Sequence, residues 1–133
     1  MESPGPETGD RFPERVVLIV HDDPAALETL ERIVAPFDYR ISLARSGAQA
    51  LAALSAFEPD VVVLDLGIVA SVEVVSRIRR EYPDVPVIVI AEHGAGLAPI
   101  EVRRLGVAGY LLKPLEPAAV GIMLAVVLTR RSK

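Results

Sequence analysis

Three ionisable side chains of the sequence, Asp22, Asp65 and Lys113, each come just after a short run of apolar residues. Clustered carboxylates suit Mg²⁺, a hard cation that prefers oxygen ligands. A lysine opposite them can pair with a carboxylate or with phosphoryl oxygens. A carboxylate held beside Mg²⁺ and a lysine can attack phosphorus and become an acyl phosphate. The three residues therefore predict a phosphoryl-accepting site, provided that the fold brings them to one place.

Five apolar runs recur along the chain at an almost constant interval, with starts 23, 22, 24 and 23 residues apart. Their content of valine and isoleucine is typical of strands that are buried on both faces. They are Val16–Val20, Tyr39–Leu43, Val61–Leu64, Val85–Ile90 and Ala108–Leu112. The segments between them show helical spacing, and five strand–helix repeats predict a parallel sheet with helices on both faces. Ligands of such sheets bind at the carboxyl ends of the strands.

Residues typical of helix starts stand at the expected boundaries. Asp23 followed by Pro24 is an N-cap with proline at the first helical position. Serines and prolines fit the starts of the other helices, at Ser46, Ser71, Pro99 and Pro117. For the second helix we predict an apolar stripe formed by Ala48, Leu51, Ala52 and Leu54.

The composition excludes several classes of protein. The 133 residues include no cysteine, which rules out a disulfide scaffold, a thiolate zinc site and a cysteine nucleophile. A net charge of -4 and a pI near 5.2 argue against nucleic-acid binding. The longest apolar run, Val120 to Leu128, is far shorter than the ~20 residues of a membrane span. We therefore expect a cytoplasmic protein with neither nucleic-acid nor membrane partners.

Three segments of the chain resemble the response-regulator receiver family of two-component signalling. Val16–Pro24 resembles the start of the family, Pro59–Leu66 its phosphoacceptor strand, and Gly106–Pro114 its last strand with the Lys-Pro signature. The resemblance covers about residues 15 to 131. It implies a flavodoxin-like three-layer α/β fold with strand order 2-1-3-4-5. The prolines and glycines among polar residues at the start of the chain predict a disordered tail over residues 1–14. A short end, 132–133, follows the domain.

The resemblance also implies a role for individual residues. Asp65 would receive phosphate from a histidine kinase or a phosphotransfer protein. Asp22 would bind Mg²⁺ directly, together with Asp65 and the backbone carbonyl of Gly67. Lys113 would bridge Asp65 or its phosphate. Tyr110 falls on the aromatic position that swings inward in the active state.

The sequence departs from the family pattern at four places. His21 replaces an acid that holds the metal through water, so we expect weak Mg²⁺ binding; a protonated His21 would instead supply part of the metal's charge. Ala91 replaces the serine or threonine whose hydroxyl bonds the phosphoryl group. Glu92 adds a carboxylate at the mouth of the site, where it would repel a phosphodonor or pair with Lys113. The loop after Asp65 is about two residues short.

The last helix suggests a surface for partners. Ile122, Met123 and Val126 lie largely off its core-facing side, and an apolar helix of this kind is either buried or meets a partner. In the family, helix 4, strand 5 and helix 5 form a dimer and partner surface. We therefore predict an interface at these three residues, for a downstream protein or a second copy of the chain.

The leading prediction is a stand-alone receiver, which accepts phosphate on Asp65, signals through this surface, and catalyses only its own phosphotransfer and dephosphorylation. The alternative is a degenerate receiver that binds partners without phosphorylation. A phosphatase of the haloacid-dehalogenase type is a distant third, because its second acid would fall on Gly67.

Overall fold

Strands and helices alternate along the chain. The structure, a computed structural model, describes residues 14–92 and 99–131. The strands are β1 Val16–Val20, β2 Arg40–Ala44, β3 Val61–Asp65, β4 Val87–Glu92 and β5 Gly109–Lys113. The helices are α1 Pro24–Val34, α2 Gly47–Phe57, α3 Ser71–Glu81, α4 Pro99–Arg104 and α5 Pro117–Arg131, with a short 3₁₀ helix η1, Ala35–Phe37, after α1. The predicted tail falls outside the described residues except for Glu14, and so does the predicted end, 132–133.

The strands form one parallel sheet in the order β2-β1-β3-β4-β5, so the predicted fold class is confirmed. β3 is buried along its whole length, as its run of valines predicts. Because β1 and β3 are neighbours in the sheet, their carboxyl ends meet at one edge. The chain turns from one half of the sheet to the other at this point, which is the usual ligand-binding position of such folds.

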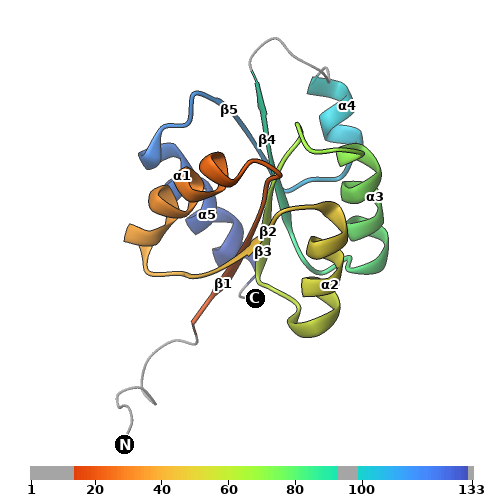
Figure 1. The fold of residues 1–133 in the computed structure, drawn as a ribbon, viewed down its shortest axis with the longest axis horizontal. Coiled ribbons are helices and arrows are strands. Elements are labelled where there is room, and N and C mark those ends of the chain that lie inside the picture. Colours follow the sequence, from red (N-terminus) through yellow and green to blue (C-terminus); the bar gives the residue numbers. More distant parts are fainter. Residues whose placement is uncertain (1–13, 93–98, 132–133) are drawn as a thin grey trace, which may run out of the picture.

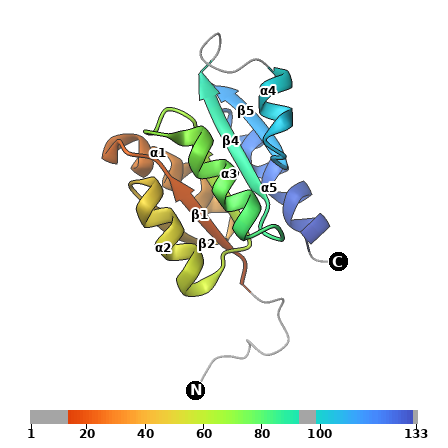
Figure 2. The same ribbon diagram turned by 90° about the vertical axis from the view of Figure 1, so that its right-hand side faces the viewer.

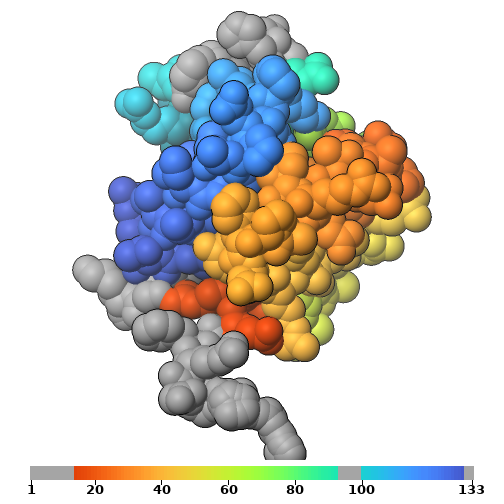
Figure 3. All heavy atoms as spheres, turned by 90° about the vertical axis from the view of Figure 1, so that its left-hand side faces the viewer, coloured from red at the N-terminus to blue at the C-terminus, as the bar shows by residue number. Residues whose placement is uncertain are grey.

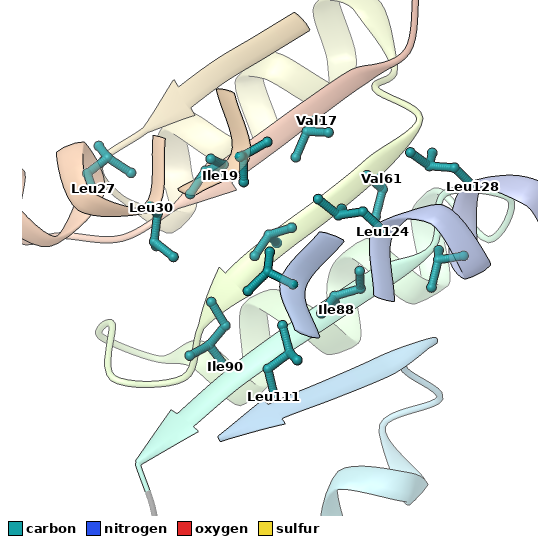
Figure 4. Close-up of a cluster of buried hydrophobic side chains, with 14 residues drawn as sticks. Val17, Ile19, Leu27, Leu30, Val61, Ile88, Ile90, Leu111, Leu124 and Leu128 are labelled. Atoms are coloured by element: carbon teal, nitrogen blue, oxygen red, sulfur yellow. The ribbon is translucent and has the colours of Figure 1, made fainter. Parts of the chain in front are cut away.

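Helices cover both faces of the sheet. α1 and α5 lie on one face and α2, α3 and α4 on the other (Figure 1; Figure 2 looks onto the second face). Each face buries its own apolar cluster. The α1/α5 cluster includes Ile19, Leu30, Ile88 and Leu124 (Figure 4). No helix among residues 14–92 and 99–131 is both long enough and apolar enough to cross a membrane.

The pleat of the strands decides which face each site residue joins. Val63 and Leu111 belong to the α1/α5 cluster, and successive side chains of a strand alternate between faces. Asp65 and Lys113, two residues further along these strands, therefore continue toward the α1/α5 face. Tyr110 packs against the opposite cluster, beneath α2, α3 and α4.

Local chemistry explains where the helices begin. Asp23 caps α1, since its carboxylate accepts from the N–H of Ala25 at 3.3 Å, and Ser46 caps α2 through the N–H of Gln49. The prediction that α3 starts at Ser71 is confirmed, although Ser71 is not its N-cap. Ser71 is the first helical residue, and the cap is Ala70, which has the left-handed φ of 57° and offers no side-chain oxygen.

The predicted apolar stripe of α2 is partly wrong. Leu54 is buried and Leu51 packs against the core, but Ala48 and Ala52 are exposed and Ala50 is buried instead. The helix is rich in alanine on every side, so packing against the sheet, rather than periodicity, selects its inner face.

Candidate functional site

Asp65 and Lys113 form an ion pair at the carboxyl edge of the sheet. Lys113 Nζ lies 2.7 Å from Asp65 Oδ2. Asp65 is the last residue of β3 and is almost fully buried, with 2% of its surface exposed. Removing a carboxylate from water is costly unless charge and hydrogen bonds compensate it. Lys113 supplies the charge, so the two residues that the sequence predicted to act together do meet.

The other carboxylate oxygen of Asp65 is held by the loop that follows β3. The N–H of Gly67 donates to Oδ1 at 2.7 Å. A Cβ on Gly67 would lie 2.9 Å from the same oxygen, so the loop approaches Asp65 as closely as it does because residue 67 has no side chain. One oxygen of Asp65 therefore accepts a backbone donor while the other faces side chains.

His21 is the second side chain that faces Asp65. It follows β1 directly, it is 8% exposed, and its Nε2 lies 3.2 Å from Asp65 Oδ2. Asp65 Oδ2 has no partner that meets the angles of a hydrogen bond, so His21 and Lys113 act on this oxygen by proximity and charge. The oxygen keeps its acceptor capacity, as a nucleophile toward phosphorus requires.

The imidazole of His21 is fixed in one orientation. The N–H of Asp23 donates to His21 Nδ1 at 3.1 Å. A ring nitrogen that accepts a hydrogen bond carries no hydrogen, so the hydrogen of the neutral ring is assigned to Nε2, on the side of Asp65.

The side chain of Asp22 is half exposed and lies on the far side of the imidazole from Asp65. Its Oδ1 is 3.4 Å from His21 Nδ1. Within the parts of the chain that the structure describes, no three acidic, histidine or cysteine side chains are grouped closely enough to hold a metal ion. The carboxylates of Asp22 and Asp65, as they stand, are separated by a ring that offers no oxygen, and the set does not fit Mg²⁺.

A cavity of about 320 Å³ opens beside the ion pair, between α1 and the segment that joins β5 to α5. His21, Asp65 and Lys113 form its polar part. Its remaining walls are mostly apolar: Ala26, Thr29, Leu30, Ile33, Pro114 and Leu115. Figure 3 shows this face of the molecule, on which α1 (orange) and α5 (blue) lie side by side.

The residues at the end of β4 have the environments that their types predict. Ala91 is buried and has no hydroxyl, and Glu92 is exposed. Glu92 is the register neighbour of Lys113, but the described ion pair of Lys113 is with Asp65. Tyr110 is half-buried against the cluster under α2, α3 and α4.

The three predicted interface residues differ in exposure. Ile122 is 65% and Val126 44% exposed on α5, one turn apart. Met123 is half-buried and packs against the α1/α5 cluster, and its Sδ would lie 2.5 Å from a Cβ on Gly109. Met123 therefore contributes to packing between α5 and β5, while the other two leave an apolar strip in solvent.

The cavity wall on α1 was not part of the prediction. Ala26, Thr29, Leu30 and Ile33 recur with the spacing of one helix face, directly after Asp22. That spacing was available in the sequence. Only the position of α1 above the strand ends shows that these residues line the site.

The sequence matches the response regulator receiver domain family over residues 17–125. The transcriptional regulatory protein PrrA of Mycobacterium tuberculosis is 32% identical over 127 residues, which cover 94% of this chain and 54% of PrrA. The regulatory protein LuxO of Vibrio cholerae is 30% identical over 98 residues, which cover 71% of this chain and 22% of LuxO. The chain thus spans between about a fifth and about half of the length of these relatives.

Solved structures agree with the fold. A putative response regulator from Chloroflexus aurantiacus superposes with a TM-score of 0.82 at 26% identity, over 89% of this chain and all of the other. A CheY-like receiver domain protein from Methanospirillum hungatei superposes with a TM-score of 0.81 at 19% identity, over 90% and 98% of the two chains. The second likeness concerns the fold alone.

Proposed function

The chain belongs to the response regulator receiver domain family, and from that premise we propose that it accepts a phosphoryl group on Asp65 from a phosphohistidine of a kinase or phosphotransfer protein. One observation carries the proposal. Asp65 is buried at the carboxyl end of β3, its Oδ2 is 2.7 Å from the ammonium of Lys113, and the residue is part of the lining of a cavity.

The transfer follows from this arrangement. A carboxylate oxygen of Asp65 attacks the phosphorus of the phosphohistidine, and the new oxygen–phosphorus bond forms as the nitrogen–phosphorus bond breaks. The electron pair of the broken bond stays on the departing imidazole. Lys113 offsets the charge of the attacking carboxylate and of the phosphoryl oxygens. The donor would approach through the cavity of about 320 Å³ beside α1, which Asp65 and Lys113 help to line.

Metal binding at this site is proposed to be weak. Receiver domains generally bind Mg²⁺ at their acidic pocket. In this chain the corresponding oxygens would come from Asp22, Asp65 and the carbonyl of Gly67, but an imidazole lies between the two carboxylates. The proposed transfer therefore uses protein groups alone.

The phosphorylated receiver would act through a protein surface in the cytoplasm. Ile122 and Val126 leave an apolar strip on α5, and we propose that a downstream protein or a second copy of this chain covers it. The chain would carry out no reaction beyond its own phosphotransfer and dephosphorylation. The stand-alone arrangement stays a prediction.

The experiment is phosphorylation by a small donor. The chain is incubated with phosphoramidate or acetyl phosphate, with and without Mg²⁺, and its intact mass is measured. We expect one added phosphoryl group, which Asp65→Asn abolishes and Asp23→Asn does not. Asp23 is a suitable control, since it is exposed and asparagine also caps a helix well. A chain that stays unmodified under both conditions contradicts the proposal.

The second candidate is a receiver that binds its partner without phosphorylation. Two observations favour it: Ala91 offers no hydroxyl to a phosphoryl group, and His21 stands beside the acceptor oxygen. The two candidates differ in one measurement. If the chain acts without phosphorylation, Asp65→Asn leaves partner binding unchanged. If it is a phosphorylated receiver, Asp65→Asn removes the dependence of partner binding on the phosphodonor.

A further inference from the structure

We infer that the imidazole of His21 occupies the place of the divalent cation at this site, and that it keeps the affinity for Mg²⁺ low by its position rather than only by the loss of an acid. The inference concerns the site of the proposed phosphotransfer and rests on that proposal for its functional meaning. Its central test needs no phosphodonor, so the two can fail separately.

The position of the ring is the first argument. His21 lies between the two carboxylates that a shared cation would have to bridge, with Nδ1 3.4 Å from Asp22 Oδ1 and Nε2 3.2 Å from Asp65 Oδ2. Mg²⁺ requires oxygen ligands at about 2.0–2.1 Å in a near-octahedral arrangement. An ion cannot take that place while the ring stays where it is.

The ring is held in place. It is 8% exposed, and the N–H of Asp23, the N-cap of α1, donates to its Nδ1 at 3.1 Å. Moving the imidazole out would break this hydrogen bond and expose a buried side chain. Entry of a cation therefore costs the rearrangement of the start of α1, in addition to the dehydration that Mg²⁺ resists.

The ring also offers the cation nothing in return. The lone pair of Nδ1 faces the N–H of Asp23, and the assigned hydrogen on Nε2 points to the side of Asp65. With no nitrogen free, the remaining donors are two carboxylates and backbone carbonyls. The described residues contain no group of three side chains that could hold a metal.

Protein groups then surround Asp65 on their own. Gly67 donates to Oδ1 at 2.7 Å, Lys113 lies 2.7 Å from Oδ2, and the imidazole lies 3.2 Å from the same oxygen. Lys113 supplies the cationic charge, Gly67 donates a backbone hydrogen bond, and the imidazole lies close to Oδ2 without meeting the angles of a hydrogen bond. A phosphoryl group arriving at Asp65 would meet these three partners without an intervening ion.

The experiment is a Mg²⁺ titration of the full ¹⁵N-labelled chain, followed at the amide of Gly67, which reports directly on Asp65. Wild type is compared with His21→Asp and His21→Asn. Asparagine removes the ring without adding charge, and aspartate adds a carboxylate as well. Mn²⁺ added at low concentration gives a second readout, because it broadens amides near a bound ion.

We expect wild type to bind Mg²⁺ at least about 10-fold more weakly than His21→Asp, since ligand charge and outer-shell groups change metal affinity by one to two decades. His21→Asn should bind more tightly than wild type and less tightly than His21→Asp. Adding Asp22→Asn to His21→Asp should remove the gain. Equal affinity of wild type and His21→Asp, or no gain on removing the ring in His21→Asn, would overturn the inference.

Phosphorylation gives an independent arm. The yield of phosphorylated wild type with phosphoramidate should be the same in Mg²⁺ and in EDTA, while that of His21→Asp should rise with Mg²⁺. A strong stimulation of wild type by Mg²⁺ would contradict the inference. If neither condition modifies wild type, the proposed phosphotransfer fails, and the titration alone decides whether the ring excludes the cation.

Discussion

Lys113 Nζ reaches to 2.7 Å from Asp65 Oδ2 although a whole strand, β4, separates β5 from β3. The two residues are the last of their strands, and both continue toward the α1/α5 face. The side chain of Asp65 is 3% exposed and that of Lys113 is 33% exposed, so a buried anion depends on a cation that reaches it from the surface. The pair therefore contributes to stability as well as to the site.

The first prediction is that Lys113→Met destabilises the fold. It leaves the Asp65 carboxylate buried without a cation, at a cost of about 1–3 kcal/mol of unfolding free energy, toward the low end because Lys113 is partly solvated. Urea denaturation measures the loss.

The double variant provides the control. In the Lys113→Met background, Asp65→Asn removes the uncompensated charge and should restore most of the stability, so that the effects of the two substitutions are not additive. Additive effects, or no loss in Lys113→Met, would show that the ion pair is unimportant for folding.

The second prediction concerns Gly121, in the second turn of α5. A Cβ there would lie 2.4 Å from two atoms of the Phe37 ring, so the ring of η1 packs on the helix where no side chain intervenes. Alanine normally stabilises a helix interior by about 0.5–1 kcal/mol relative to glycine. Here overpacking should outweigh that gain and cost about 1–3 kcal/mol.

Removing the ring should reverse the sign. In a Phe37→Ala background, Gly121→Ala should become stabilising, because the helix preference is then unopposed. Both substitutions are measured by thermal and urea unfolding. A stabilising Gly121→Ala in the wild-type background would mean that the ring moves aside at little cost.

The third prediction is that Ala70→Gly stabilises the fold by about 0.5–1 kcal/mol, because the left-handed conformation costs an alanine about 1–2 kcal/mol and glycine much less. Ala48→Gly, at an exposed helical position of α2, is the matched control and should destabilise by a similar amount. Equal effects of the two substitutions would contradict a strained Ala70.

The strands and most of the site could be predicted because they depend on short-range patterns. Val61–Asp65 reads as a buried strand that ends in an acid, and parallel strands bring such ends together whatever the rest of the chain does. The loop after it could not be predicted in the same way. Nothing in the type of Ala70 indicates a left-handed residue, and the conformation is imposed by the short connection between β3 and α3.

The orientation of His21 shows a second limit of sequence reasoning. The sequence identified the residue as a departure from the family and left open whether its ring would be neutral. The orientation of the ring depends on the N–H of Asp23, whose direction is set by the start of α1. A side-chain orientation that rests on one backbone donor is a tertiary property, and no periodicity encodes it.

The fourth prediction concerns the apolar strip on α5. Ile122→Asp combined with Val126→Ser should leave the unfolding free energy almost unchanged, since both side chains are largely exposed, and should weaken self-association or partner binding. Analytical ultracentrifugation measures the self-association. Met123→Ser is the contrasting variant, because Met123 packs on the core and its replacement should lower stability. If the double variant self-associates and binds partners as the wild type does, this surface is not an interface.

The last prediction tests whether Ala91 uncouples phosphorylation from Tyr110. Ala91 is buried at the end of β4 and has no hydroxyl, while Tyr110 packs beneath α2, α3 and α4. A hydrogen bond to a charged phosphoryl group is worth about 1.5–3 kcal/mol, which is comparable to the difference between two states of a switch. Without it, phosphorylation of Asp65 should leave the ring resonances of Tyr110 nearly unchanged in NMR spectra.

Ala91→Thr should restore the donor, and the Tyr110 resonances should then shift on phosphorylation. Asp65→Asn in the same background should abolish that shift. Large shifts of Tyr110 in the phosphorylated wild type would show that the ring is coupled to Asp65 by a route that needs no hydroxyl at residue 91.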